Sequence, residues 1–160
     1  MAGSTTKKAV IHRFERADLE GYVSPLSYLQ AAGVELLSAE GQIAAIPYSE
    51  IKSVAFVREF EISPEDSRKV FLTRPKMEGL WVRFVFRDGE VMEGVMPNNL
   101  LPVEQYGFTV IPPDPYSNQQ RLFIPRAALR SAEVLGVVGS PLKRRRAKAA
   151  PKEQIGLFDE

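Results

Sequence analysis

Side chains that commonly perform catalysis are few in this chain. It has one histidine, His12, and no cysteine, so a thiolate nucleophile or a thiolate metal site is impossible. The sequence contains no HExxH, P-loop or GxGxxG motif and no evident Ser-His-Asp set. Glu90 and Glu93 are three residues apart on an expected strand, where they would point to opposite faces and could not act as a pair. We therefore expect a protein that is not an enzyme, with no catalytic residue, metal or cofactor, and a structural or surface role for His12.

A second group of residues is suited to binding nucleic acid. Aromatic rings, amides and an arginine gather between Tyr106 and Arg121, with Tyr116 near the middle of the segment. Rings that stack on bases beside amide and guanidinium donors are typical of sites for single-stranded nucleic acid. The alternative is a β-hairpin with Phe108 in the core and a polar tip.

Basic residues are concentrated near the C-terminus. Six of them and no acidic residue lie between Lys143 and Lys152. The run Lys143, Arg144, Arg145 and Arg146 has no apolar periodicity, which predicts a disordered segment. Such a run can bind the phosphates of DNA or RNA by counterion release, without reading their sequence. The alternative is a segment that only keeps the tail in solution.

The chain ends in QIGLFDE, which places apolar side chains at the end of this basic tail. Gln154, Ile155, Leu157 and Phe158 resemble the short motif by which bacterial proteins dock on the DNA sliding clamp. The resemblance implies that Gln154 hydrogen-bonds at the edge of a groove and that the three apolar side chains fill pockets. Ile155 departs from the motif, in which leucine is commoner at this position. There are two alternatives: the pattern arises by chance, or the segment is a terminal strand that packs on the folded part.

Length, composition and charge limit the number of domains and the kinds of partner that the chain can have. A chain of 160 residues forms one domain or two small ones, and a hydrophobic content of 44% is enough for a core. The 21 basic and 20 acidic residues nearly cancel, so net charge indicates no particular partner. No stretch approaches the roughly 18 apolar residues of a membrane span, and no signal peptide is evident. We expect a soluble cytoplasmic protein that does not enter a membrane.

The residues that would position these groups form a predicted β-hairpin from Arg83 to Gly94. Apolar and polar residues alternate on both sides of Asp88-Gly89, and this is a strong hairpin signal. Gly94 predicts a bulge or sharp bend. One face would be buried and would hold Phe84, Phe86, Val91 and Val95, while the other would face water and hold Arg83, Arg87, Glu90 and Glu93.

The sequence also contains an ordered internal repeat. Five strands are expected in the first part of the chain, at Ala9–Phe14, Leu19–Val23, Gly33–Leu37, Ile43–Ile46 and Ile51–Val57. The repeat pairs Leu19-Glu20-Gly21 with Met92-Glu93-Gly94, Gly33–Leu37 with Gly107–Ile111, Ile46-Pro47 with Ile124-Pro125, and Ile51-Lys52-Ser53 with Leu129-Arg130-Ser131. Each proline should end its strand and lead into a tight helical turn, because proline cannot donate to a β-ladder. The pattern favours a duplication over chance similarity between hairpins.

The second copy resembles the Sm-like (LSm and Hfq) small barrels. Phe86–Gly89 followed by Gly94 is similar to the first Sm motif, and Phe123–Leu129 is similar to the turn joining the last two strands. The resemblance implies a mostly β chain of two tandem five-stranded antiparallel barrels. It also implies an RNA site at Asn98, Asn99 and Arg126, although the usual Lys-His pair is missing beside Arg126. Residues 8 to 140 also resemble an uncharacterised bacterial family with tandem copies.

The expected organisation has five parts. Residues 1–7 form a disordered N-terminus, 8–57 the first barrel, 58–79 a linker with a short helix from Pro64 to Leu72, 80–138 the second barrel, and 139–160 the flexible basic tail. A nucleotide-binding barrel of the PilZ type is rejected. Its RxxxR pair is missing, since Arg68 and Arg74 are six residues apart, and no D/NxSxxG turn follows.

We therefore expect a binding or adaptor protein that is associated with nucleic acid and docks on the sliding clamp through its tail. The alternatives are an Sm-like RNA-binding module and a scaffold that binds only protein, and pairing of strand edges between copies stays open. Candidate nucleic-acid contacts are Asn98, Asn99, Tyr116, Arg121, Arg126, Lys143, Arg144, Arg145 and Arg146.

Overall fold

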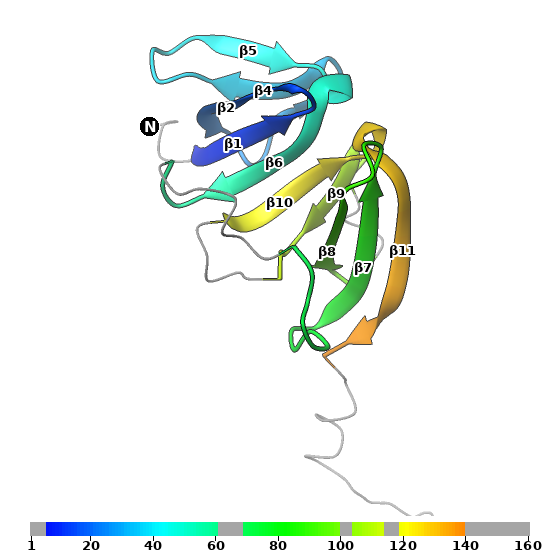
Figure 1. The fold of residues 1–160 in the computed structure, drawn as a ribbon. Coiled ribbons are helices and arrows are strands. Elements are labelled where there is room, and N and C mark those ends of the chain that lie inside the picture. The colour runs from blue at the N-terminus through cyan, green and yellow to red at the C-terminus, as the bar shows by residue number, and fades with distance from the viewer. Residues whose placement is uncertain (1–5, 61–68, 100–103, 114–118, 140–160) are drawn as a thin grey trace, which may run out of the picture.

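The computed structural model describes residues 6–60, 69–99, 104–113 and 119–139, and these residues form a mostly β, curled antiparallel structure (Figure 1). The described residues contain no α-helix, only short 3₁₀ turns. The strands are β1 (Lys7–Arg13), β2 (Arg16–Val23), β3 (Leu29–Gln30), β4 (Gly33–Leu37), β5 (Ile43–Ile46), β6 (Ile51–Val57), β7 (Gly79–Phe86), β8 (Val91–Met96), β9 (Gly107–Val110), β10 (Gln119–Pro125) and β11 (Leu129–Val138), with the turns η2 (Tyr48–Glu50) and η4 (Arg126–Ala128).

Strands of the first half pair in the order β6-β1-β2-β4-β5, and all of these pairs are antiparallel. The two-residue strand β3 adds to β4 on the side where β2 lies. The η2 turn follows Pro47 and leads from β5 directly into β6. The chain therefore leaves one edge of this half at β5 and returns to the opposite edge at β6.

Strands of the second half pair in the corresponding order, β11-β7-β8-β9-β10. Antiparallel ladders join β11 to β7, β7 to β8, and β10 to β9. Val95 of β8 joins the β9 side through two backbone hydrogen bonds with Ile111, of 3.0 and 2.9 Å. The η4 turn follows Pro125 and leads into β11 in the same way as η2 leads into β6.

Equivalent positions in the two halves also make equivalent contacts. The amide of Phe14 donates to the carbonyl of Glu50 at 3.1 Å, and the amide of Arg87 donates to the carbonyl of Ala128 at 2.9 Å. Each bond joins the end of a half's first strand to its 3₁₀ turn. The common strand order therefore extends to individual backbone contacts.

The halves are joined by pairing between β6 and β10, which lie side by side in Figure 1. Phe56 lies opposite Arg121, Ala55 opposite Leu122, and Val54 opposite Phe123. Phe123 belongs to the second half, yet its fully buried ring packs in the core cluster that contains most of the first half's buried side chains. In return, Ala55 of β6 packs in the core cluster of the second half. Each core is therefore completed by side chains of the other half.

Most local expectations from the sequence are confirmed. The strands over 33–37, 43–46 and 51–57 have the predicted bounds, and 3₁₀ turns follow both Ile-Pro steps. The expected helix at 64–72 is not found where it can be checked, because Lys69–Leu72 are not helical and 64–68 lie outside the described residues. The first strand begins at Lys7, inside the segment expected to be disordered.

The face assigned to Glu93 in the β7–β8 hairpin was wrong. The turn forms at Asp88-Gly89, but Glu93 is only 6% exposed, and it accepts hydrogen bonds from the Trp81 indole at 3.1 Å and the Phe71 amide at 3.0 Å. The segment that enters β7 covers this carboxylate and provides one of the donors. Val91, expected in the core, is instead 39% exposed.

Gly94 does not mark a bulge, because the β7–β8 register passes through it without a shift. A Cβ atom at Gly94 would lie 3.0 Å from Val110 Cγ2 and 3.2 Å from the carbonyl oxygen of Ile111. Glycine at this position allows β8 to approach the β9 side closely.

Candidate nucleic-acid groove between the two halves

Two neighbouring cavities, of about 280 and about 500 Å³, lie along the junction of the halves. They share four lining residues: Pro97, Glu104, Thr109 and Arg121. The smaller is also lined by Val95, Met96, Asn99, Phe108, Val110 and Ile111, and the larger by Lys7, Lys8, Pro25, Tyr28, Phe56, Val57 and Gln120. We call the pair the junction groove.

Positive charge predominates among the lining residues of the junction groove. Among the described lining residues, Lys7, Lys8 and Arg121 contribute three cationic side chains, against the single carboxylate of Glu104. Lys8 is already partly engaged, because its Nζ lies 3.4 Å from a carboxylate oxygen of Glu59 in a half-exposed pair. The groove therefore offers Lys7 and Arg121 as its main cationic side chains for an anionic ligand.

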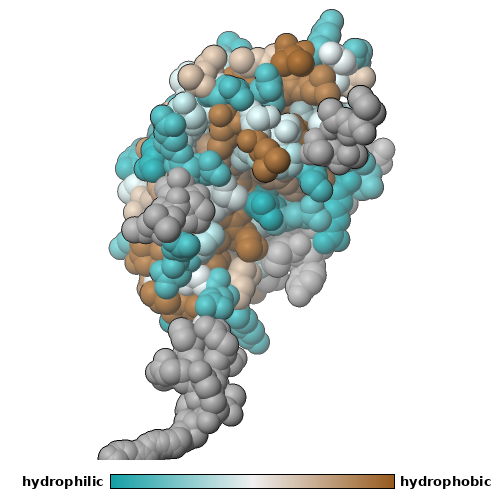
Figure 2. All heavy atoms as spheres, turned by 180° about the vertical axis from the view of Figure 1, so that it is seen from behind, coloured by the Kyte–Doolittle hydropathy of each residue, from teal (hydrophilic) through white to brown (hydrophobic). Residues whose placement is uncertain are grey.

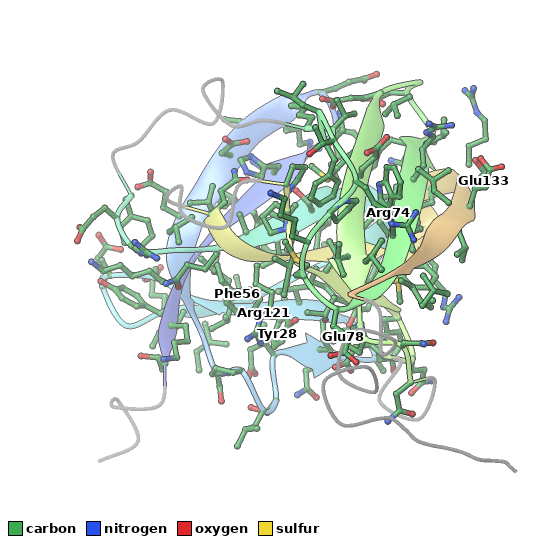
Figure 3. The ribbon with its side chains drawn as sticks, turned by 90° about the horizontal axis from the view of Figure 1, so that it is seen from below. Tyr28, Phe56, Arg74, Glu78, Arg121 and Glu133 are labelled. Carbon is green, nitrogen blue, oxygen red and sulfur yellow. The ribbon has the colours of Figure 1, made fainter. Side chains whose placement is uncertain are left out.

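Aromatic side chains form the floor of the larger cavity. Tyr28 and Phe56 meet edge to face with ring centroids 5.5 Å apart, and Arg121 lies beside them (Figure 3). Burial raises the pKa of Tyr28, and the charge of Glu104 adds to the rise, so the phenol stays neutral at physiological pH. Its hydroxyl is hydrogen-bonded to the side chain of Thr109. Tyr28 is only 5% exposed and packs in the core of the first half, so the half-buried ring of Phe56, beside the Arg121 guanidinium, is the ring available to a nucleobase.

A second aromatic pair joins η2 to the second half. Tyr48 and Tyr106 are stacked, with centroids 4.8 Å apart and planes 14° from parallel. The Tyr48 hydroxyl donates to the carbonyl of Gln30 at 2.7 Å. Partial burial raises the pKa of Tyr48 to about 12, with further contributions from Tyr106 and Glu104. The charge of Glu104 thus raises the pKa of both Tyr28 and Tyr48.

A different set of polar contacts joins the halves near the β7–β8 turn. Lys52 of β6 forms ion pairs with Asp88, at 2.8 Å, and with Glu90, which also pairs with Lys69. Partial burial acts to lower the pKa of Lys52, but the hydrogen bonds to the two carboxylates outweigh it and the pKa is raised. The Lys52 hydrogen bond in turn lowers the pKa of Asp88. These charges are paired with one another across the junction of the halves.

Comparison with known proteins places the chain in a family. A family model described as a family of unknown function, DUF6982, matches residues 5–136. The chain belongs to the family DUF6982. No curated protein matches the sequence, and no solved structure matches the fold. The family match contains all residues that line the junction groove and ends before the basic tail.

Within the DUF6982 region, the structure brings together only some of the site residues expected from the sequence. Arg121 and Asn99 both line the junction groove, and Asn98 is exposed next to Asn99. Arg126 is not among the lining residues; its Nε donates to the carbonyl of Gln105 at 3.3 Å, and its guanidinium lies 4.8 Å from the centre of the ring of Phe108, which lines the groove. The remaining candidates lie outside the described residues: Tyr116, Lys143, Arg144, Arg145, Arg146, Gln154, Ile155, Leu157 and Phe158.

The groove residues of this DUF6982 chain that sequence reasoning missed include the charged and aromatic Lys7, Lys8, Tyr28, Phe56 and Glu104. The adjacent lysines before a predicted strand were a usable signal, whereas nothing in the sequence connects Tyr28 with Arg121. In the described parts of the chain, no group of three or more His, Cys, Asp or Glu side chains could hold a metal ion. No helix in those parts has the length and apolar character needed to cross a membrane.

Proposed function

We propose that this DUF6982 chain is a non-enzymatic adaptor that docks on the bacterial DNA sliding clamp through its C-terminal tail. The observation that carries the proposal is the motif formed by Gln154, Ile155, Leu157 and Phe158 at the end of the chain. The last described strand, β11, ends at Val138, and the motif follows it in the sequence. Apolar anchors on such a segment contribute most of a peptide's affinity for its groove.

We further propose that the folded part is two tandem Sm-like barrels. The common strand order of the halves supports this, because each has five antiparallel strands, the two-residue β3 left aside, with a 3₁₀ turn between the fourth and the fifth. The buried Gly33 and Gly107 add support, since each lies against the carbonyl of the isoleucine in the Ile-Pro step of the neighbouring strand, Ile46 or Ile124. In this organisation the barrels are the cargo-binding end of the adaptor.

Clamp docking predicts saturable binding of the full-length protein to the host's sliding clamp, with a Kd of about 1–50 µM. The variant Leu157→Ala, Phe158→Ala should bind at least about tenfold more weakly, because it loses two buried anchors. Surface plasmon resonance on immobilised clamp measures both proteins. The matched control is Lys143→Ala, Arg144→Ala, which removes charge from the tail but leaves the motif intact. Equal binding by the anchor variant and the original protein would refute the proposal.

The second candidate function is binding of single-stranded RNA by the barrels. The junction groove favours it, because Lys7 and Arg121 line the larger cavity together with the half-buried ring of Phe56. Cationic side chains that follow a strand's phosphates, next to rings that accept its bases, are the general means of binding unpaired nucleic acid. This function does not need the tail, so it can be tested separately.

Groove binding predicts that Arg121→Ala weakens binding of a fluorescein-labelled oligouridine by about threefold to tenfold and lowers the salt slope by about 0.7. Fluorescence anisotropy over a series of salt concentrations measures both effects. Arg130→Ala is the control, because it removes an equal charge from an arginine whose guanidinium binds the carbonyl of Arg87 instead of the groove. Deletion of residues 141–160 should leave most of the binding. If that deletion abolishes it, the basic tail and not the groove binds RNA.

A further inference from the structure

Glu104 is the one carboxylate among the described residues that line the junction groove, and it lines both cavities. The phosphates of a ligand are attracted by Lys7 and Arg121, and they are repelled by Glu104. This carboxylate therefore weakens the binding of any ligand that is held through phosphates alone. It adds to the affinity only if the ligand donates hydrogen bonds to it.

The side chains of Glu104 and Arg121 are both available to a ligand. Both residues are exposed and line both cavities. Among the described residues neither side chain forms a hydrogen bond or an ion pair, with the other or with a third residue. The groove thus presents one charged acceptor and one charged donor group that are not satisfied within the protein.

Most of the other residues that line the smaller cavity are apolar: Val95, Met96, Pro97, Phe108, Val110 and Ile111. The side chain of Ile111 is 38% exposed, so a flat apolar group placed against it would remove it from water. Apolar walls with a few charged groups suit a ring that has apolar faces and polar edges, such as a nucleobase. On the face shown in Figure 2, hydrophobic residues lie only in separate patches among hydrophilic ones, so that face offers no broad apolar surface as an alternative site.

The charged pair in this cavity matches the edges of one base better than those of the others. Guanine has two adjacent N–H donors, on N1 and on the 2-amino group, and two adjacent acceptors, O6 and N7. Two parallel N–H groups can donate to the two oxygens of one carboxylate, and a guanidinium can donate to O6 and N7. Uracil has a single N–H between two carbonyls, and the amino groups of adenine and cytosine lie beside ring acceptors, so these bases offer a carboxylate only one good hydrogen bond.

We propose that the smaller cavity of the junction groove binds a guanine base, with Glu104 accepting from N1–H and the 2-amino group and Arg121 donating to O6 and N7. The apolar side chains of the cavity contact the faces of the base. Guanine recognition here rests on ligand binding by the junction groove, the second candidate function, and identifies the base that the groove selects.

The larger cavity is suited to the phosphate that accompanies this base. It shares Glu104 and Arg121 with the smaller cavity, so one ligand can extend through both. Its lining includes Lys7, which is exposed and can reach a phosphate. Sites for small ligands have volumes of roughly 300–1,000 Å³, and the two cavities, of about 280 and about 500 Å³, together have room for one nucleotide.

This site differs from the RNA site that the resemblance to Sm-like barrels implies. The residues of that site are Asn98, Asn99 and Arg126, and none of them has a carboxylate. Selection of guanine depends on Glu104, which lines the groove at the junction of the two halves. The tandem arrangement of the halves therefore creates a specificity that neither half has alone.

Fluorescence anisotropy of the full-length protein tests the preference with two labelled probes, an oligouridine and the same oligonucleotide with one guanosine at its centre. The original protein should bind the guanosine probe about tenfold more tightly. Glu104→Gln should remove most of this difference, because an amide has only one acceptor oxygen. The same variant should bind the oligouridine slightly more tightly, since it loses a charge that repels phosphates.

The matched control is Glu40→Gln, which removes an equal charge from an exposed turn residue outside the groove lining and should keep the full difference. Equal binding of both probes by the original protein, or a difference that survives Glu104→Gln, would overturn guanine recognition and leave RNA binding by the groove standing. If the original protein binds neither probe, both ideas fail.

Base analogues test the same contacts without changing the protein. Inosine in place of the central guanosine removes the 2-amino group, and with it one of the two donors to Glu104. The inosine probe should lose most of the preference with the original protein and should bind Glu104→Gln as tightly as the guanosine probe does. Inosine that binds the original protein as well as guanosine does would overturn the role of Glu104.

The guanine base could reach the groove within RNA or as a free nucleotide, and competition distinguishes these sources. Guanosine monophosphate that displaces the guanosine probe, where adenosine monophosphate does not, would show that the base and one phosphate suffice. If neither displaces the probe while the preference between the two oligonucleotides remains, the base is recognised within an RNA strand. Equal displacement by both nucleotides would overturn the selection of guanine.

Discussion

Replacing Phe123 by alanine is expected to lower the free energy of unfolding by about 3–5 kcal/mol. The ring is fully buried, and its centroid lies 6.0 Å from that of Tyr28 in an edge-to-face contact. Its β-strand belongs to the second half, whereas the core cluster that surrounds it includes Ile11, Val34 and Val54 of the first half. The cavity left by the substitution would therefore lie in the core of the first half, although the substituted residue is on a strand of the second half.

This arrangement predicts that the halves unfold together. Trp81, the single tryptophan, reports on the second half, so urea unfolding followed by its fluorescence should coincide with unfolding followed by far-UV circular dichroism. Phe123→Ala should move both curves by the same amount. Leu72→Ala, at a side chain that is 76% exposed, is the control and should change stability by less than about 0.5 kcal/mol. A shift in one probe without the other would mean that the halves are independent domains.

Replacing Gly33 by alanine is expected to cost about 3 kcal/mol or more, through two separate causes. The residue has a φ of +144°, which L-residues rarely adopt. In addition, a Cβ atom there would overlap the backbone carbonyl oxygen of Ile46 on β5. A backbone atom in a paired strand cannot move aside as the end of a flexible side chain can, so the β4–β5 ladder would have to separate locally.

Gly41 provides a matched control for this second prediction. It also has a positive φ, +89°, but a Cβ atom there would have no neighbour within 4 Å. Gly41→Ala should therefore cost only about 1–2 kcal/mol, from backbone strain alone. Thermal and urea unfolding measure the loss of stability in each variant. The difference between the two losses gives the cost of the overlap with the carbonyl oxygen of Ile46. Equal losses would show that the close approach at Gly33 contributes nothing.

Features of the fold that are encoded locally could be predicted from the sequence. Proline at 47 and 125 cannot continue a ladder, so the strand ends and 3₁₀ turns that follow them were visible in the residues themselves. The burial of the Glu93 side chain could not be predicted in this way. Its burial depends on Phe71 and Trp81, which reach it from another segment and another strand, and no alternation pattern records such a contact.

The candidate groove was only partly predictable, for the same physical reason. Arg121 was found because it ends a polar segment with aromatic residues, and Asn99 was found through the resemblance to Sm-like barrels. Lys7 and Tyr28 come from the first half and reach the groove only because β6 pairs with β10. A pairing between strands so far apart in the chain is decided by tertiary packing, and a single sequence does not show it.

The joint between β6 and β10 also has a consequence for protein synthesis. The ribosome completes β6 well before β10, and the segments that form β7, β8 and β9 are made in between. Throughout that interval the nascent first half has Val54 and Ala55 uncovered at its edge and lacks the ring of Phe123 in its core. Exposed strand edges of this kind are where incompletely folded chains aggregate. The growing polypeptide should therefore bind general chaperones most strongly before residue 125 leaves the exit tunnel, and should lose that affinity once β10 has docked.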